Sequence, residues 1–207
     1  AASGEYDDNW KKAADMVVEL ANAGGFQAGF ETSDYGTTKN LFTNGQAAMY
    51  YMGSWEMSIA TDENIPEDIR SSFSVFMMPA VDGGAGSVTD IAAWNGGGYA
   101  IPENAANKEA AIALLNYMFE PENWSKLCWE NGVCMSAQNF GDYLTGEETS
   151  LQNDWVEIVN NATSLTGVTL NDLGSSEFKT VSEDAVIELT IGSISSDEFF
   201  EKLAAVK

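Results

Sequence analysis

Apolar residues recur at helical spacing along much of this chain. The first stripe comprises Trp10, Ala13, Ala14, Val17, Leu20 and Ala21. Asp7 and Asp8 precede this stripe, and Gly24 and Gly25 follow it. Acidic residues commonly cap the start of a helix, and glycine commonly ends one. The pattern therefore predicts an amphipathic helix that begins after Asp8 and stops before the glycine pair.

Similar signals predict several more helices. They lie in 37–45, from Ser54 onward, in 108–119 after Asn107, from Pro121 through Cys128, in 151–161, in 178–189, and after Ser195. Ser195 and Glu198 have the spacing of a capping box. Positions 110–115 are apolar almost all round, so we expect that helix to be covered on more than one side.

Three short segments carry a strand pattern instead. They are the apolar run 47–52, the alternating run 72–79 that ends at Pro79, and residues 99–101. Residues 82–87, DGGAGS, are typical of a turn. These elements together predict an α/β fold that is predominantly helical with a few short strands.

The sequence WNGGG, which begins at Trp94, is unusual in front of a strand. Successive glycines weaken a strand, so either the chain turns sharply there or another molecule approaches the backbone closely. The glycine spacing does not fit the GxGxxG loop of dinucleotide-binding proteins.

Charge narrows the range of partners. The chain has 32 acidic and 9 basic residues, a net charge of −23. Such a surface repels nucleic acid and anionic membranes, so neither is expected as a partner. The acidity fits either simple solubility or a cationic ligand. A hydrophobic content of 44% indicates a folded chain.

Catalytic and cofactor motifs are not evident. The sequence has no histidine, the commonest general base and metal ligand, and it has no P-loop or GxSxG motif. We expect no cofactor and no metal. Cys128 and Cys134 fit neither a metal knuckle nor a CxxC motif, which leaves a small disulfide or two buried thiols as alternatives. No apolar run reaches the length of a membrane span, so direct membrane insertion of this segment is not expected.

Three stretches, taken in order, resemble the C-terminal half of family 1 extracellular solute-binding proteins, the receptors of ABC importers. The first is LFTNGQAAMYYMGSWEMS (41–58), similar to the family's F-x-x-G-x-A-A-M, strand and G-[SP]-W. The second is MMPA followed by WNGGGYAIPENAANKEAAIALLNYM (94–118), and the third is AVIELTIGSISSDEFFEKL (185–203).

The resemblance implies a type II periplasmic-binding-protein-like fold. Residues 1–90 would be part of the C-terminal lobe, 91–140 the crossover and a segment of the N-terminal lobe, and 141–207 a helical return to the C-terminal lobe. It also implies that the chain is a fragment lacking most of the first lobe. We therefore expect it to bind sugar poorly by itself, at millimolar levels or weaker.

The implied function is non-catalytic capture of a mono- or oligosaccharide by lobe closure. The implied partner is the membrane permease of an ABC importer. The full-length protein would be an extracellular lipoprotein tethered to the membrane, or periplasmic.

The resemblance also nominates site residues. Trp55 follows a strand end, where its ring can stack on a sugar, although it also fits a core position. Trp94 and Asn95 would offer a ring and an amide to the ligand, and Gly96 and Gly97 would let the backbone pass close to it. Weaker candidates are Glu56, Asp34 and Tyr35. We expect Phe178 to be a core residue, and we expect Trp10, Trp124, Trp129 and Trp155 to be packing residues on helix faces.

The sequence is also compatible with two alternative functions. The ligand could be a polyamine or another cation, held by Asp34, Glu56 and Asp90. The chain could instead be a carboxylate-based glycan hydrolase, which needs two facing carboxyl groups that no motif supplies. Sequence does not separate transport from delivery of ligand to a sensor kinase.

Overall fold

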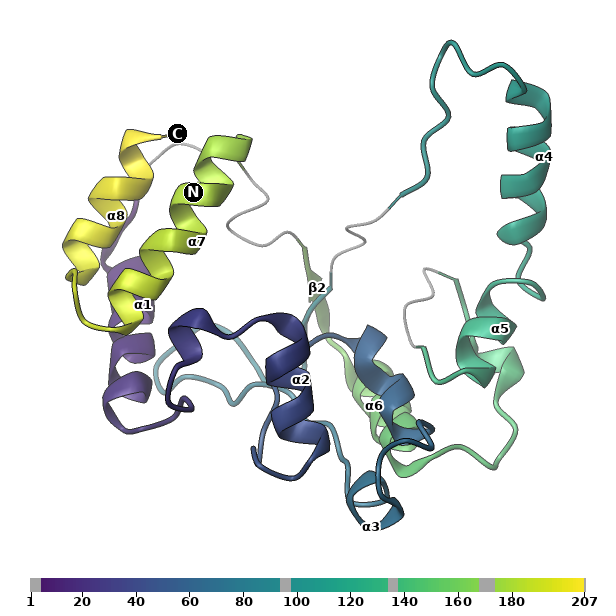
Figure 1. Cartoon of the computed structure of the whole chain (residues 1–207), viewed down its shortest axis with the longest axis horizontal. Coiled ribbons are helices and arrows are strands. Elements are labelled where there is room, and N and C mark those ends of the chain that lie inside the picture. The colour runs from purple at the N-terminus through teal and green to yellow at the C-terminus, as the bar shows by residue number, and fades with distance from the viewer. Residues whose placement is uncertain (1–4, 94–97, 134–137, 168–173, 207) are drawn as a thin grey trace. The chain divides into compact units, whose positions relative to one another are not determined.

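The computed structural model describes residues 5–93, 98–133, 138–167 and 174–206 (Figure 1). The α-helices are α1 (Asp8–Asn22), α2 (Tyr35–Thr43), α3 (Glu67–Arg70), α4 (Lys108–Met118), α5 (Ser125–Glu130), α6 (Ser150–Asn161), α7 (Ser176–Thr190) and α8 (Ser196–Ala205). Short 3₁₀ helices are η1 (Phe30–Thr32), η2 (Ser54–Ala60) and η3 (Gly141–Tyr143). The strands are β1 (Asp90–Ala92) and β2 (Ser164–Thr166). The predominantly helical fold with few short strands is as predicted.

Side-chain caps fix where several helices begin. The Asp7 carboxylate accepts hydrogen bonds from the backbone N–H groups of Asn9 and Trp10 at the start of α1. The predicted capping box of Ser195 and Glu198 is present at α8, and Thr149 with Gln152 forms a second one at α6. These bonds satisfy N–H groups that the first turn of a helix leaves without partners.

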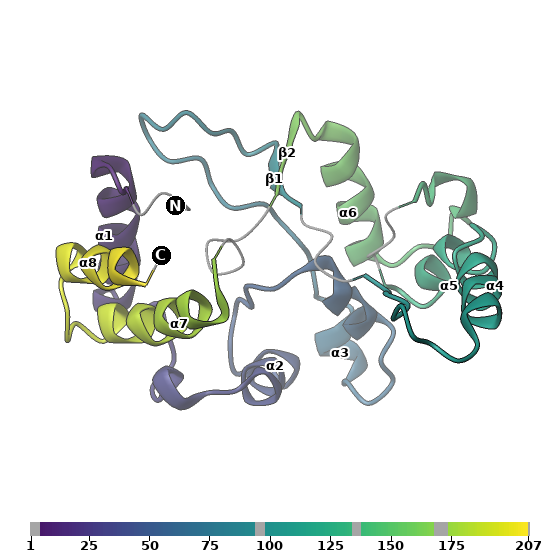
Figure 2. The same ribbon diagram turned by 90° about the horizontal axis from the view of Figure 1, so that it is seen from above.

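The chain divides into two units, which we describe separately. The first comprises residues 1–37 and 168–207. Its helices α1, α7 and α8 lie side by side in both views (Figures 1 and 2). Their shared core contains Ala14, Phe178, Ala185, Leu189, Phe199, Phe200 and Leu203. Phe178 is therefore a core residue, as expected from its place in the apolar stripe.

The second unit comprises residues 38–167. Its core gathers Met57, Ile59, Ile65, Phe73, Trp129 and Leu151. The Trp129 ring stacks on Phe140 with a centroid distance of 4.6 Å. The expectation that Trp129 is a packing residue is confirmed, whereas Trp10 of the first unit is 37% exposed. In this core, residues from η2 meet residues from α5 and α6 that lie far along the chain.

The strands differ from those expected. β1 and β2 form a parallel pair in which Asp90, Ile91 and Ala92 lie opposite Ser164, Leu165 and Thr166. The predicted strands 47–52, 72–79 and 99–101 join no ladder in the described part of the chain. Residues 73–78 nonetheless alternate in burial: Phe73 is buried and Val75 and Met77 are partly buried, whereas the residues between and after them are exposed.

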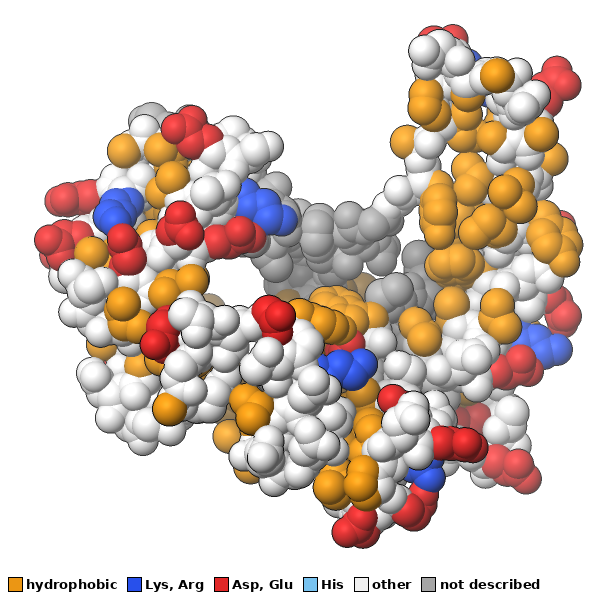
Figure 3. All heavy atoms as spheres, viewed as in Figure 1, with side chains coloured by type: hydrophobic (Ala, Val, Ile, Leu, Met, Phe, Trp, Pro, Cys, Tyr) orange, Lys and Arg blue, Asp and Glu red, His pale blue; other side chains and the backbone are white. Residues whose placement is uncertain are grey.

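Helix α4 also differs from its prediction, because none of its residues is buried. Ile112, Leu114 and Tyr117 are all exposed, and apolar side chains are visible over this helix in Figure 3. An apolar helix is buried only where a second element packs against it. Among the described helices and strands, none packs closely against α4. Among the described residues, no helix is both long and apolar enough to cross a membrane.

Candidate functional site

Trp55 lies in the first turn of η2, two residues after Gly53, whose backbone is extended. Met57 and Ile59, further along η2, are buried in the core of the second unit and anchor this helix. The Trp55 side chain remains 47% exposed. A rigid turn therefore holds a large aromatic ring at the surface, which is the geometry that stacking on a ligand requires.

Gly53 makes room for this ring. A β-carbon at Gly53 would lie 2.1 Å from Cζ3 of Trp55 and 2.3 Å from its Cη2. Such distances are far inside van der Waals contact, so any other residue at position 53 forces the indole to move. The glycine and the tryptophan both belong to the sequence motif G-S-W. The motif alone did not reveal that Gly53 lies against the Trp55 ring.

Glu56 is directed inward rather than toward solvent. Glu56 is only 7% exposed. Its carboxylate oxygen Oε2 lies 3.2 Å from Nζ of Lys39 in α2. Burial raises the pKa of the Glu56 carboxyl above its usual value. Through this ion pair, Lys39 holds Glu56, the residue that follows Trp55 in η2. The sequence analysis did not nominate Lys39 as a site residue.

Asp34 and Tyr35 lie at the start of α2, in the first unit. Oδ1 of Asp34 accepts a hydrogen bond of 2.7 Å from the backbone N–H of Thr37. Hydrogen bonding to Thr37 lowers the pKa of the Asp34 carboxyl. Asp34 therefore acts as a helix cap, and Tyr35 beside it is exposed.

The remaining candidates, Trp94, Asn95, Gly96 and Gly97, lie outside the described residues. Their role stays a prediction. The segment that leads to them is well fixed: Oδ1 of Asp90 accepts hydrogen bonds from the Ser164 hydroxyl at 2.6 Å and the Thr163 hydroxyl at 3.4 Å. The pKa of the Asp90 carboxyl is lowered, chiefly by the bond from Ser164.

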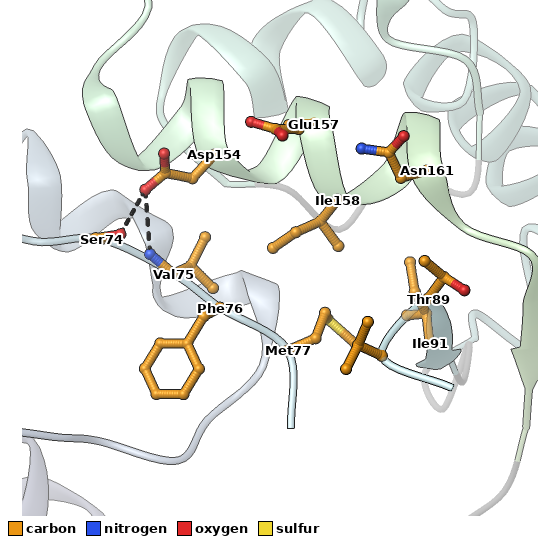
Figure 4. Close-up of a pocket in the computed structure, with 11 residues that line it drawn as sticks. Ser74, Val75, Phe76, Met77, Thr89, Ile91, Asp154, Glu157, Ile158 and Asn161 are labelled. Carbon is orange, nitrogen blue, oxygen red and sulfur yellow. Dashed lines mark hydrogen bonds between the residues drawn. The ribbon is translucent and has the colours of Figure 1, made fainter. Parts of the chain in front are cut away.

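A groove that the sequence did not predict lies between residues 74–77, residues 88–91 and helix α6 (Figure 4). Its volume is about 370 Å³. Oδ2 of Asp154 closes one end, where it accepts hydrogen bonds from the Ser74 hydroxyl at 2.7 Å and the Val75 N–H at 3.3 Å. Helix α6 and the apolar run 72–79 were predicted, but strand β1 was not, and no local pattern indicated that these segments meet.

In the described part of the chain, no group of three or more acidic, cysteine or histidine side chains is arranged to hold a metal ion. Cys128 is half-buried and carries a free thiol, and burial raises its pKa. Cys134 lies outside the described residues.

Comparison with known families gives one match. The model of the bacterial extracellular solute-binding protein family matches residues 1–123. No curated protein matches the chain. The matched region contains η2, Lys39 and every residue that the resemblance nominated, and it is more than half of the sequence. The chain belongs to the family of bacterial extracellular solute-binding proteins.

Proposed function

We propose that this protein is the solute-capture component of an ABC importer and that its ligand is a mono- or oligosaccharide. The observation that carries the proposal is the exposed ring of Trp55, which rises from a buried turn in a member of a solute-binding family. Sugars present flat apolar faces of C–H groups, and aromatic rings at a protein surface are suited to contact them.

The carboxylates favour a neutral ligand over a cation. A polyamine needs several carboxylates free to face it, and Asp34, Glu56 and Asp90 were the candidates. Asp34 caps α2, Glu56 pairs with Lys39, and Asp90 accepts bonds from Ser164 and Thr163. Each already accepts a hydrogen bond or forms an ion pair within the protein, which leaves fewer of its acceptor sites available to a cationic ligand.

Capture by lobe closure follows from the proposed lobe assignment. In it, residues 1–90 and 141–207 contribute to the C-terminal lobe, and residues 91–140 contribute the crossover and part of the N-terminal lobe. Closure would bring the WNGGG segment to the ligand, with Trp94 and Asn95 as contacts and the glycines allowing close approach. The closed form would then dock on a membrane permease.

The same proposal places the protein outside the cytoplasmic membrane. The family is extracellular or periplasmic, and we propose tethering as a lipoprotein in the full-length protein. Its family is one of binding proteins, and we propose that it works by binding alone.

Isothermal titration of the full-length protein against a panel of neutral oligosaccharides, with spermidine included, tests the proposal. We expect one sugar to bind at micromolar concentration and Trp55→Ala to weaken it more than tenfold. Tyr117→Ala, which removes an exposed ring from α4, is the matched control and should leave the affinity unchanged. Binding of spermidine alone would overturn the sugar assignment, and an unchanged affinity in Trp55→Ala would remove Trp55 from the site.

A further inference from the structure

Two successive tyrosines between α2 and η2 differ sharply in burial. The Tyr50 ring stacks on Phe42 of α2 with a centroid distance of 5.6 Å, and its hydroxyl oxygen is buried. Phe42 in turn stacks on the core residue Phe73. Tyr51, by contrast, is 82% exposed. The core of the second unit therefore anchors this segment through Tyr50, and the next side chain along the chain lies at the surface.

The Trp55 ring is directed back along the chain toward Tyr51. Its atoms Cζ3, Cη2 and Cε3 lie 2.5 Å or less from the position that a β-carbon of Gly53 would take. The six-membered part of the indole thus lies over residue 53, two residues after Tyr51. Two residues span about 7 Å at most, so these ring atoms lie within about 11 Å of the Tyr51 Cα. A ligand that consists of linked sugar rings can therefore reach both side chains at once.

The rings of Tyr51 and Trp55 are both accessible to such a ligand. Within the described part of the chain, neither ring packs against another aromatic ring, and the Tyr51 hydroxyl forms no hydrogen bond. Tyrosine and tryptophan rings combine a flat apolar face with a polar group at the edge. A sugar ring has the matching pattern, since its faces carry C–H groups and its edge carries hydroxyl groups.

The segment that carries the two rings is uncharged. No acidic or basic residue occurs in residues 40–55, although 20% of the whole chain is charged. The charged residues at either end of this segment, Lys39 and Glu56, form an ion pair with each other. Residues 40–55 therefore offer no charge to an ionic ligand, which favours a neutral ligand at this place on a strongly acidic protein.

We propose that Tyr51 and Trp55 stack on two sugar rings of one ligand, which is therefore a neutral oligosaccharide of at least two units. This inference rests on the proposed function, adds Tyr51 as a second contact and narrows the ligand from any sugar to an oligosaccharide. A monosaccharide stacked on Trp55 leaves Tyr51 in water, whereas a longer ligand brings a second ring to Tyr51. Tyr51 thus determines selectivity for ligand length and not affinity for the first ring.

Titration calorimetry of the full-length protein tests this inference with homologous series of one to four units, built from glucose, xylose, mannose or galactose. In the series that binds, we expect lengthening of the ligand to tighten binding about tenfold in the natural sequence. Tyr51→Ala should abolish this gain and leave the monosaccharide affinity unchanged. Tyr51→Phe keeps the ring and should retain the gain. Trp55→Ala should instead weaken binding of every length.

Tyr117→Ala is the matched control, because it removes a ring that is 63% exposed from α4 and should keep the gain with length. Tyr51 is mostly exposed, so its truncation should leave thermal unfolding unchanged. The inference is overturned, and the proposed function kept, if sugars bind without a gain with length or if the gain survives in Tyr51→Ala. A gain that Tyr117→Ala removes equally also overturns it. If no series binds to the natural sequence, the proposed function fails and this inference fails with it.

Discussion

The Trp55 indole lies against Gly53 so closely that a β-carbon at position 53 would be 2.1 Å from Cζ3 of the ring. The two residues are separated only by Ser54, and the backbone at Gly53 is extended. The glycine is required here for space rather than for an unusual backbone angle. The position of the proposed sugar-stacking ring thus depends on a missing side chain two residues earlier.

Gly53→Ala should displace Trp55 without unfolding the protein. The ring is half exposed and can swing outward, so we expect a change in unfolding free energy of about 1 kcal/mol or less. The fluorescence emission of Trp55 should shift to longer wavelength, because the displaced indole is more exposed to water. In the full-length protein, sugar affinity should fall about tenfold or more although the tryptophan is retained.

The control for this prediction is the same substitution in a Trp55→Phe background. There the emission shift should disappear, because the atoms nearest to a β-carbon at position 53 belong to the Trp55 indole. An emission spectrum and an affinity both unchanged in Gly53→Ala would show that the ring does not rest on the glycine.

Lys39→Met should destabilise the fold in a pH-dependent way. At pH 7 it removes the cation beside the buried Glu56 carboxylate, which we expect to cost about 1–2 kcal/mol since Lys39 is itself partly exposed. Burial raises the pKa of Glu56 in the folded state, so protonation of this group favours folding. The cost of the substitution should therefore shrink as pH falls through that pKa.

Urea unfolding at pH 7 and pH 4 measures this difference. The double variant Lys39→Met with Glu56→Gln should be more stable at pH 7 than Lys39→Met alone, because it no longer buries a carboxylate whose ion-pair partner has been removed. Equal stabilities of the single and double variants would mean that Glu56 and Lys39 are not coupled.

Glu148 should have the opposite pH dependence. Its carboxylate accepts hydrogen bonds from the backbone N–H groups of Thr145 and Gly146, at 2.5 and 2.8 Å. The bond from Thr145 is the largest cause that lowers the pKa of Glu148 to about 2. A depressed folded-state pKa stabilises the fold above the unfolded value of about 4.3, and this stabilisation is lost as pH falls toward 2.

Glu148→Gln should therefore be less stable than the natural sequence at pH 7, with the difference narrowing steadily between pH 4.5 and pH 2. Glu147→Gln removes the same charge one residue earlier and serves as the control. If both variants follow the same pH profile, the effect is one of net charge and not of the hydrogen bonds to Glu148.

Leu203→Ala should destabilise the first unit strongly. Leu203 is fully buried between the helices of its core, and such truncations cost about 2–5 kcal/mol. Leu20→Ala removes the same atoms from an exposed position in α1 and should cost less than about 1 kcal/mol. Chemical unfolding followed by circular dichroism compares the two, and equal losses would contradict this core.

The sequence predicted the helices best because their signals are local. Asp7, Ser195 and Glu198 are close in sequence to the N–H groups that they cap, so a short window contains the whole interaction. The stripe that contains Phe178 likewise identified a buried face of α7. The family resemblance, based on short motifs in a fixed order, is confirmed by the family match.

Strand pairing and the details of the site were harder to predict because they are not local. The segments 47–52 and 72–79 have strand patterns, but a pattern does not say whether a neighbour is present to form a ladder. The actual strands are only three residues long, too short for a periodic signal. Likewise, Lys39 and Glu56 come together only when α2 and η2 pack.

The parallel pair of β1 and β2 also has a kinetic consequence. Asp90 and Ser164 are 74 residues apart, and closing a loop of that length costs about 4 kcal/mol of chain entropy before any ladder bond forms. Helices α7 and α8, by contrast, are neighbours in sequence and pack directly. Pulse-labelling hydrogen exchange should find the α7–α8 hairpin protected early in refolding and residues 164–166 protected late, so that the parallel pair of β1 and β2 is a late step of folding.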